Sequence, residues 1–72
     1  MLIDYSKLIG RIIEKFGSRT AFAKAIGWNL EVLSRRLNNK ARWNPEDYIR
    51  TCEILDIDPE EIYAYFFTPK LR

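Results

Sequence analysis

Histidine is absent from this 72-residue sequence, and cysteine occurs once, at Cys52. The first absence removes the side chain that most often carries acid–base chemistry near neutral pH and most often binds metal ions. One cysteine alone forms neither an internal disulfide nor a thiolate-rich metal site. Because Cys52 lies between Ile49 and Leu55 in a helical pattern, we interpret it as a small buried hydrophobe. We expect no bound metal and no cofactor.

Glycine is also scarce, and the sequence contains no glycine-rich loop of the kind that binds phosphates in nucleotide-dependent enzymes. Nor does a pair of carboxylates indicate a catalytic pocket. The acids Glu46, Asp47, Glu60 and Glu61 instead occupy expected helix starts, where they complement the helix dipole. We therefore expect no catalytic residues, no enzymatic activity and no small-molecule ligand.

Long apolar runs are missing as well, since no run approaches the roughly 20 apolar residues that span a bilayer. The opening residues 1–4 lack a charged leader with an apolar segment and a cleavage site. A chain of this length supports one hydrophobic core. These features predict a single cytoplasmic domain over residues 1–72, without contact to a membrane.

What the sequence does contain is a helix, a tight turn and a second helix near its middle. Ser18 is placed to cap the first helix, and Gly27 follows its last apolar residue, where a left-handed conformation costs glycine little. Asn29 is placed to cap the second helix, in which Leu33 and Leu37 lie one turn apart on one face. Because the connection is too short for antiparallel packing, we expect the helices to cross steeply, as in a helix-turn-helix.

A further helix is predicted before this motif. Asp4 is placed to cap it, and it runs to about Phe16. Gly10 in its middle suggests close approach of another helix. One broad stripe is apolar and is formed by Leu8, Ile9, Ile12, Ile13 and Phe16.

Two more helix starts follow the motif. Asn44, Pro45 and Asp47 have the spacing of an N-cap, a first helical residue and a capping-box partner. Trp43 and Tyr48 have the spacing of a hydrophobic staple. The same pattern returns later in the sequence. Asp58 is at the N-cap position, Pro59 is the first helical residue and Glu61 is the capping-box partner. Ile57 and Ile62 have the spacing of the hydrophobic staple. The expected architecture is all-α with five helices.

The central residues resemble a known family. The likeness is carried by TAFA at residues 20–23, IG at 26–27, LSR at 33–35 and LN at 37–38. This pattern is similar to the helix-turn-helix of lambda-repressor-like proteins, the Cro-like and repressor-like proteins of temperate phages and their bacterial relatives. The chain ends, DYSKL at 4–8 and YFFTP at 65–69, resemble those of small phage-encoded members.

The resemblance implies a compact five-helix lambda-repressor-like domain in a bacterial host cell. It also implies that the second motif helix, residues 29–38, enters the DNA major groove. Arg36 departs from the family pattern, because many members carry an apolar residue there. We expect Leu33 and Leu37 to supply the core contacts instead.

Positive charge is concentrated on the motif, although the whole chain carries only +2. Residues 19–42 hold six cations against one acid, a net charge of +5. Residues 43–72 hold three cations against seven acids, a net charge of −4. Such asymmetry is typical of a phosphate-facing surface on an otherwise acidic body. We therefore predict a sequence-specific DNA-binding transcriptional regulator.

The first turns of a recognition helix contact base edges, so the predicted base contacts are Asn29, Leu30, Glu31, Ser34 and Arg35. Arg35 is the strongest candidate, because its guanidinium can donate two hydrogen bonds to guanine; a phosphate contact or a solvated charge is the alternative. Leu30 can touch a thymine methyl or belong to the core. Glu31 can accept from cytosine or only complement the helix N-terminus, and Asn29 is a cap first.

The predicted phosphate contacts lie at the start of the first motif helix and in the loop after the second. They are Arg19, Thr20, Asn38, Asn39, Lys40 and Arg42. We interpret Lys24 and Arg36 as solvated charges on a helix face, and Trp43 as a packing residue.

One module of this size offers limited contact area, so we expect two copies on a twofold-symmetric DNA operator with half-sites about 34 Å apart. The protein would then be a homodimer at least on double-stranded DNA. The rival hypothesis is a helix-turn-helix used only for protein interaction, such as an antitoxin or an anti-repressor partner. The segment with Tyr65, Phe66 and Phe67 fits either a completed core or a dimer interface.

Overall fold

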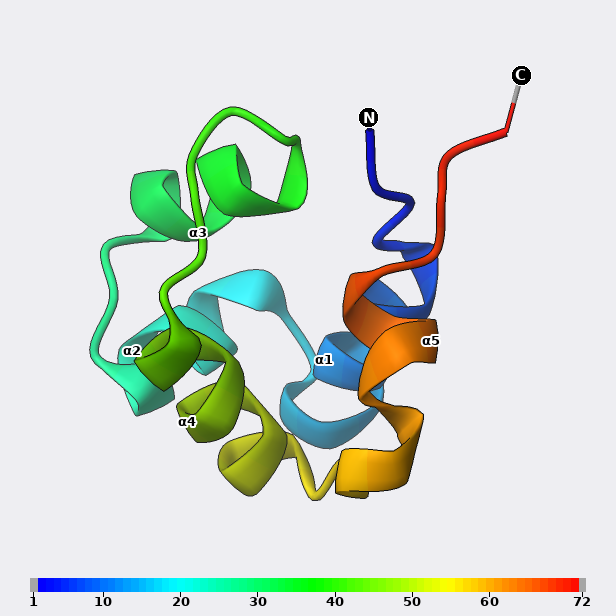
Figure 1. Ribbon diagram of the computed structural model, residues 1–72. Helices are drawn as coiled ribbons and strands as arrows, with labels where there is room; N and C mark the ends of the chain where they lie inside the picture. Colours follow the sequence, from blue (N-terminus) through cyan, green and yellow to red (C-terminus); the bar gives the residue numbers. More distant parts are fainter. Residues whose placement is uncertain (1, 72) are drawn as a thin grey trace.

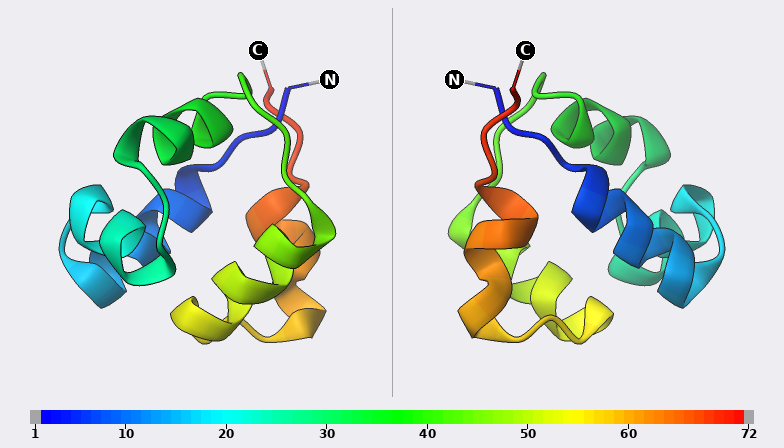
Figure 2. Two further views of the ribbon diagram at one scale, coloured as in Figure 1. Left: turned by 90° about the vertical axis from the view of Figure 1, so that its left-hand side faces the viewer. Right: turned by 90° about the vertical axis from the view of Figure 1, so that its right-hand side faces the viewer.

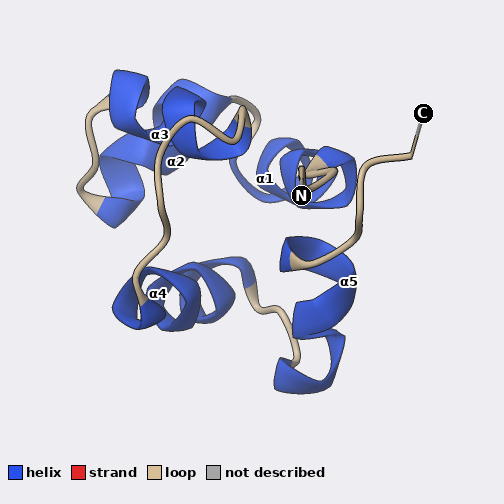
Figure 3. Ribbon diagram, turned by 45° about the horizontal axis from the view of Figure 1, so that its top comes forward, coloured by secondary structure: helices blue, strands red, loops and turns tan. Residues whose placement is uncertain are grey.

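The computed structural model describes residues 2–71, so Arg72, counted above among the cations, lies outside the described residues. Five α-helices follow one another, the last preceded by a single 3-10 turn (Figure 1). They are α1 (Ser6–Phe16), α2 (Arg19–Ile26), α3 (Leu30–Leu37), α4 (Pro45–Leu55), the turn η1 (Pro59–Glu61) and α5 (Ile62–Phe66). Residues 2–71 contain no strand, which confirms the all-α prediction (Figure 3).

The helix-turn-helix forms where its capping residues predict. The Ser18 hydroxyl accepts a hydrogen bond from the amide of Ala21 at 3.1 Å, and the Asn29 side chain accepts one from the amide of Glu31 at 2.7 Å. Each side chain satisfies one of the amides that a helix start leaves unpaired. Gly27 ends α2 at φ +85°, a conformation that L-residues rarely adopt. The turn is therefore set by local chemistry.

The start of α1 differs slightly from the prediction. Its N-cap is Tyr5, and Asp4 lies one residue earlier. The Asp4 carboxylate nevertheless accepts hydrogen bonds from the Ser6 amide at 2.9 Å and the Ser6 hydroxyl at 2.6 Å. These bonds lower the pKa of the Asp4 carboxyl. Tyr5 itself is buried in the core.

The start of α4 follows its predicted pattern, whereas at the later start, among the described residues, only the Asp58 cap is found and Glu61 forms no capping-box hydrogen bond. The Asp47 carboxylate accepts a hydrogen bond from the Asn44 amide at 2.8 Å, and the rings of Trp43 and Tyr48 stack with centroids 5.4 Å apart. Asp58 accepts from the amide of Glu60 at 2.9 Å. The second start, however, leads into one 3-10 turn and a short helix, so the fifth helical segment is brief.

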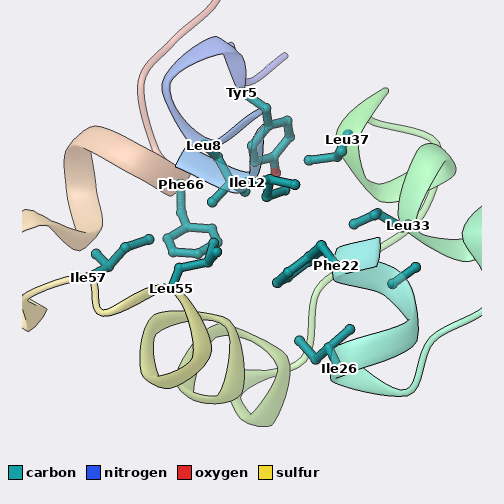
Figure 4. Packing of buried hydrophobic residues seen from close by; sticks show 11 residues of the cluster. Tyr5, Leu8, Ile12, Phe22, Ile26, Leu33, Leu37, Leu55, Ile57 and Phe66 are labelled. Atoms are coloured by element: carbon teal, nitrogen blue, oxygen red, sulfur yellow. The ribbon is translucent and has the colours of Figure 1, made fainter. Parts of the chain in front are cut away.

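All five helices surround one core (Figure 4). Its buried side chains are Tyr5, Leu8, Ile12, Phe22, Ala23, Ile26, Leu33, Leu37, Leu55, Ile57 and Phe66. Trp43 packs beside this core, with its ring near those of Tyr5, Trp28, Tyr48 and Phe66 at centroid distances of 5.2–5.9 Å. The packing role predicted for Trp43 is confirmed.

Three expectations about burial need correction. Ile13 belongs to the apolar stripe of α1 by spacing, yet it is 44% exposed. Ile49 is 58% exposed, and Cys52 beside it is half-buried rather than fully buried. The apolar stripes of α1 and α4 are therefore wider than the surface that neighbouring helices cover. Burial raises the pKa of the Cys52 thiol.

The aromatic segment near the C-terminus divides between core and surface. Phe66 is completely buried and completes the core, as one of the two interpretations predicted. Tyr65 is half-buried beneath the Lys7 ammonium, which lies 4.9 Å from its ring centroid. Phe67 stays partly exposed against Tyr48 and Tyr63.

The two chain ends lie side by side (Figure 2). Ile3 and Pro69 form an isolated antiparallel bridge, supported by a 2.8 Å hydrogen bond from the Asp4 amide to the Thr68 carbonyl. Asn39 joins this pairing from the loop after α3. Its side-chain amide accepts a hydrogen bond from the Ile3 amide and donates one to the Ile3 carbonyl, both at 2.9 Å.

Within residues 2–71, none of the helices is long and apolar enough to cross a membrane. Gly10 also departs from its prediction, because no helix approaches it closely. Apart from its own helix backbone and chain neighbours, no heavy atom of the described residues lies within 4 Å of the place a Gly10 Cβ would occupy. The glycine therefore costs helix stability without a packing gain.

We expect Gly10→Ala to raise the free energy of unfolding by about 0.5–1 kcal/mol, because alanine loses less conformational freedom in a helix. Urea denaturation measures the change. Gly17→Ala is the matched control and should lower stability, since Gly17 ends α1 at φ +83°. A less stable Gly10→Ala protein would show that α1 requires glycine there.

Candidate nucleic-acid interface

The helix α3 lies at the edge of the molecule, with one face on the core and the other in solvent (Figures 1 and 4). Leu33 and Leu37 are buried and hold its inner face against the core. The residues predicted to contact bases share the outer face or the preceding turn. Asn29, Leu30, Glu31 and Arg35 are exposed, and Ser34 is partly exposed.

The structure decides between the alternatives for two of these residues, Asn29 and Leu30. Asn29 is the N-cap of α3, as expected, and its oxygen is occupied by the amide of Glu31. Leu30 is 42% exposed, so it is not a core residue and is accessible to a ligand. The base contacts themselves stay predictions.

The cations near α3 are available for anions. Arg35, Lys40 and Arg42 are exposed, and Arg19 is partly exposed at the start of α2. No acidic side chain among residues 2–71 forms an ion pair with any of these four. Thr20 and Asn38 are exposed beside them. We call these residues the basic surface: Arg35, Asn38, Lys40 and Arg42 lie in the last turn of α3 and the segment after it, and Arg19 and Thr20 lie at the start of α2.

The cations of α1 are occupied elsewhere. Arg11 donates hydrogen bonds to the carbonyls of Leu55 and Asp56 at 2.8 and 3.1 Å, and it pairs with Glu14 at 3.2 Å. Lys15 pairs with the Asp56 carboxylate at 2.8 Å, and this hydrogen bond lowers the pKa of Asp56. These contacts tie α1 to the C-terminal end of α4. Arg11 and Lys15 are therefore committed to contacts within the fold.

Asn39 has a structural role that the sequence analysis missed. Both polar atoms of its side chain are occupied by Ile3, and its backbone lies in the left-handed region at φ 62°. In this arrangement its side chain is committed to the fold rather than available for a phosphate. Asparagine tolerates this conformation better than most residues, which is the one local indication of its role.

Comparison with known families gives a match over residues 1–69. The matching family is described as protein of unknown function (DUF739). The chain belongs to this family. A search of curated proteins gives no significant match.

A solved structure agrees with this assignment and with the fold. The protein is similar to the modulator of repression (MOR) of the temperate bacteriophage TP901-1 from Lactococcus lactis, whose solution structure is known. The sequence identity is 36%, and the match covers all of this chain and 97% of the other. The two folds agree with a TM-score of 0.83.

In this DUF739 member, Arg36 is not the solvated charge that we expected. Its side chain is only 14% exposed, and one guanidinium nitrogen lies 3.1 Å from a carboxylate oxygen of Asp47. The guanidinium carbon lies 4.4 Å from the ring centroid of Trp28 and 5.9 Å from that of Trp43. The planar cation thus fills an apolar position by lying against aromatic rings while a carboxylate balances its charge.

Two features of the sequence bear on this arrangement. Arg36 occupies a position that is often apolar in the family it resembles, which indicates an inward side chain. Both tryptophans of the chain flank α3, at positions 28 and 43. Local pattern alone did not connect Arg36 with Asp47, because the two belong to different helices and Asp47 already has a capping role.

We expect Arg36→Ala to lower the free energy of unfolding by about 2–4 kcal/mol, because it leaves a nearly buried carboxylate without its cation and removes the contact with Trp28. Denaturant unfolding followed by tryptophan fluorescence measures the change. Arg35→Ala, on the exposed face of the same helix, should change stability by less than about 0.5 kcal/mol. Equal stability of the two variants would contradict a structural role for Arg36.

Proposed function

We propose that this protein is a regulator of repression in a temperate phage, and that it acts inside the bacterial host by binding operator DNA through α3. The matched solution structure is that of a modulator of repression, and its similarity extends over this whole chain. The observation that carries the DNA proposal is the exposed outer face of α3, surrounded by cations that have no acidic partner within residues 2–71.

In the proposed complex α3 enters the major groove, with Leu33 and Leu37 facing the core. Arg35 then donates two hydrogen bonds to a guanine, and Ser34 allows close approach to a base edge. Glu31 accepts from a cytosine amine or disfavours other bases. Asn29 keeps its oxygen on the α3 amide and can donate only from its amide nitrogen.

Phosphates on either side of the groove are proposed to meet two groups of cations. Arg19 and Thr20 lie in the first turn of α2, where unpaired amides and the helix dipole favour an anion. Lys40 and Arg42 lie in the loop after α3, next to exposed Asn38. Two copies on a twofold-symmetric operator would place two α3 helices in successive major grooves, about 34 Å apart.

Selection from random duplex DNA tests this function, followed by binding of the enriched duplex at several salt concentrations. We expect an inverted repeat to be enriched and to bind well above random DNA, with a steep salt dependence. No enrichment, with salt-sensitive binding equal for all sequences, would contradict operator recognition.

A second candidate function is protein interaction, in which α3 or a neighbouring face binds another regulator. It is favoured by the exposed apolar residues Leu30 and Val32 on α3, since Val32 does not point into the core. The name of the matched protein, modulator of repression, specifies neither DNA nor a protein as its target. If no DNA sequence is enriched, loss of partner binding by Leu30→Asp would support this candidate.

We expect Arg35→Ala to relax discrimination at one base position by about 1–3 kcal/mol while leaving the salt dependence nearly unchanged. Binding to a set of operators, each with one base pair altered, measures this. Lys24→Ala is the matched control, because Lys24 is an exposed cation outside the predicted contact set. A uniform loss across all duplexes would place Arg35 among the phosphate contacts.

We expect Lys40→Ala to weaken binding to all sequences about equally and to reduce the slope of log K against log salt by about 1, because one fewer phosphate is neutralised. Titrations at several salt concentrations measure the slope. An unchanged slope would remove Lys40 from the interface.

A further inference from the structure

A second exposed surface lies at the other end of the molecule from α3. A groove of about 610 Å³ separates the C-terminal half of α4 from η1 and the start of α5. Figure 1 shows this part of the chain below the core, with α3 above it. The groove is lined by Ile49, Cys52, Glu53, Asp56, Ile57, Asp58, Pro59 and Ile62.

The floor of the groove is mainly apolar. Ile49, Cys52 and Ile62 approach it from α4 and α5, and Ile49 is 58% exposed. The buried core residues of these two helices are instead Leu55 of α4 and Phe66 of α5. Such a concave apolar surface is typical of a binding site.

The rim of the groove is acidic. Its charged lining residues are Glu53, Asp56 and Asp58, and the lining contains no cation. Lys15 pairs with the Asp56 carboxylate at 2.8 Å and Arg11 donates to the Asp56 carbonyl at 3.1 Å, whereas Glu53 and Asp58 form no ion pair within residues 2–71. Exposed Glu60 and Glu61 follow on η1, and Arg50 is the nearest cation in sequence. The rim therefore repels nucleic acid and attracts a cationic ligand.

We propose that this groove binds an amphipathic helix of another protein, whose aliphatic side chains contact Ile49 and Ile62 and whose lysine or arginine residues face Glu53 and Asp58. An apolar groove between helices is the usual receptor for such a helix, and complementary charges at its rim select the partner. The proposal goes beyond DNA binding by α3 and does not depend on it.

The single cysteine of the chain provides a measurement at this site, because Cys52 lines the groove. The probe is a synthetic amphipathic helix of about 18 residues made of leucine, alanine and lysine, a length that supports helix formation. We expect it to slow the modification of Cys52 by a thiol reagent about tenfold at about ten times its Kd, since only free protein reacts. The experiment contains no DNA, so its failure is distinct from failure of operator binding.

Matched variants and peptides make the test specific. Ile49→Asp should abolish protection, whereas Ile13→Asp, at an exposed isoleucine on α1, should retain it. Glu53→Lys should weaken binding, whereas Glu46→Lys, at the other end of α4, should not. A peptide with glutamate in place of lysine, and a scrambled peptide of the same composition, should both leave Cys52 reactive.

Three outcomes would overturn the proposal. Equal protection by the scrambled peptide would show non-specific attraction to acidic surfaces. Protection that survives Ile49→Asp, in a variant whose circular dichroism shows an intact fold, would place the binding site elsewhere. The Cys52 thiol could also become protected when the protein alone is concentrated. If sedimentation then gave the mass of a dimer, a second copy of this chain would fill the groove.

Discussion

The ion pair between Arg36 and Asp47 joins α3 to α4, in addition to the packing of α3 on the core. The inner face of α3 contributes two buried leucines, whereas Arg36 reaches across to the first turn of α4. The same carboxylate caps α4 through the Asn44 amide, so one side chain both starts α4 and holds α3 beside it. The indole of Trp28 covers the guanidinium, which shields this pair from water and strengthens it.

Charge is separated in space as well as in sequence. Arg11 and Lys15 of α1 contact the end of α4, and Lys7 lies over the ring of Tyr65. Four acids without an ion pair within residues 2–71, Glu53, Asp58, Glu60 and Glu61, lie on the late part of α4 and at η1, which Figure 1 shows at the end of the molecule opposite α3, although Glu31 on α3 is also unpaired. A chain with a net charge of only +2 therefore presents two surfaces of opposite sign. Each surface selects a different class of ligand.

Much of the fold could be predicted from the sequence because its helix ends are set locally. Ser18, Gly27, Asn29 and Asp47 act within three or four residues of their own positions, and such signals are visible in a single sequence. Periodicity was less informative, since it marks an apolar face without showing how much of that face a neighbour covers. Ile13 lies beyond the covered area for this reason.

The candidate site could be predicted only in part, because a single sequence shows local contacts and does not show contacts between distant residues. The exposed face of α3 follows from helical spacing, and the structure places every predicted base-contact residue on that face or at its N-cap. Arg36 and Asn39, however, were assigned to solvent or phosphate because their partners are distant in sequence. Asn39 and Ile3 are 36 residues apart, and no local pattern connects them.

These distant contacts determine how rigidly α3 can be presented. A helix of eight residues is too short to be stable alone in water, so α3 exists because the core, Arg36 and the loop around it hold it in place. Asn39 fixes that loop to Ile3, and Ile3 is paired in turn with Pro69. The chain ends thus support the segment that carries Lys40 and Arg42. A surface ordered before binding loses less conformational entropy on contact with its ligand, so residues far from α3 contribute to its affinity without touching the ligand.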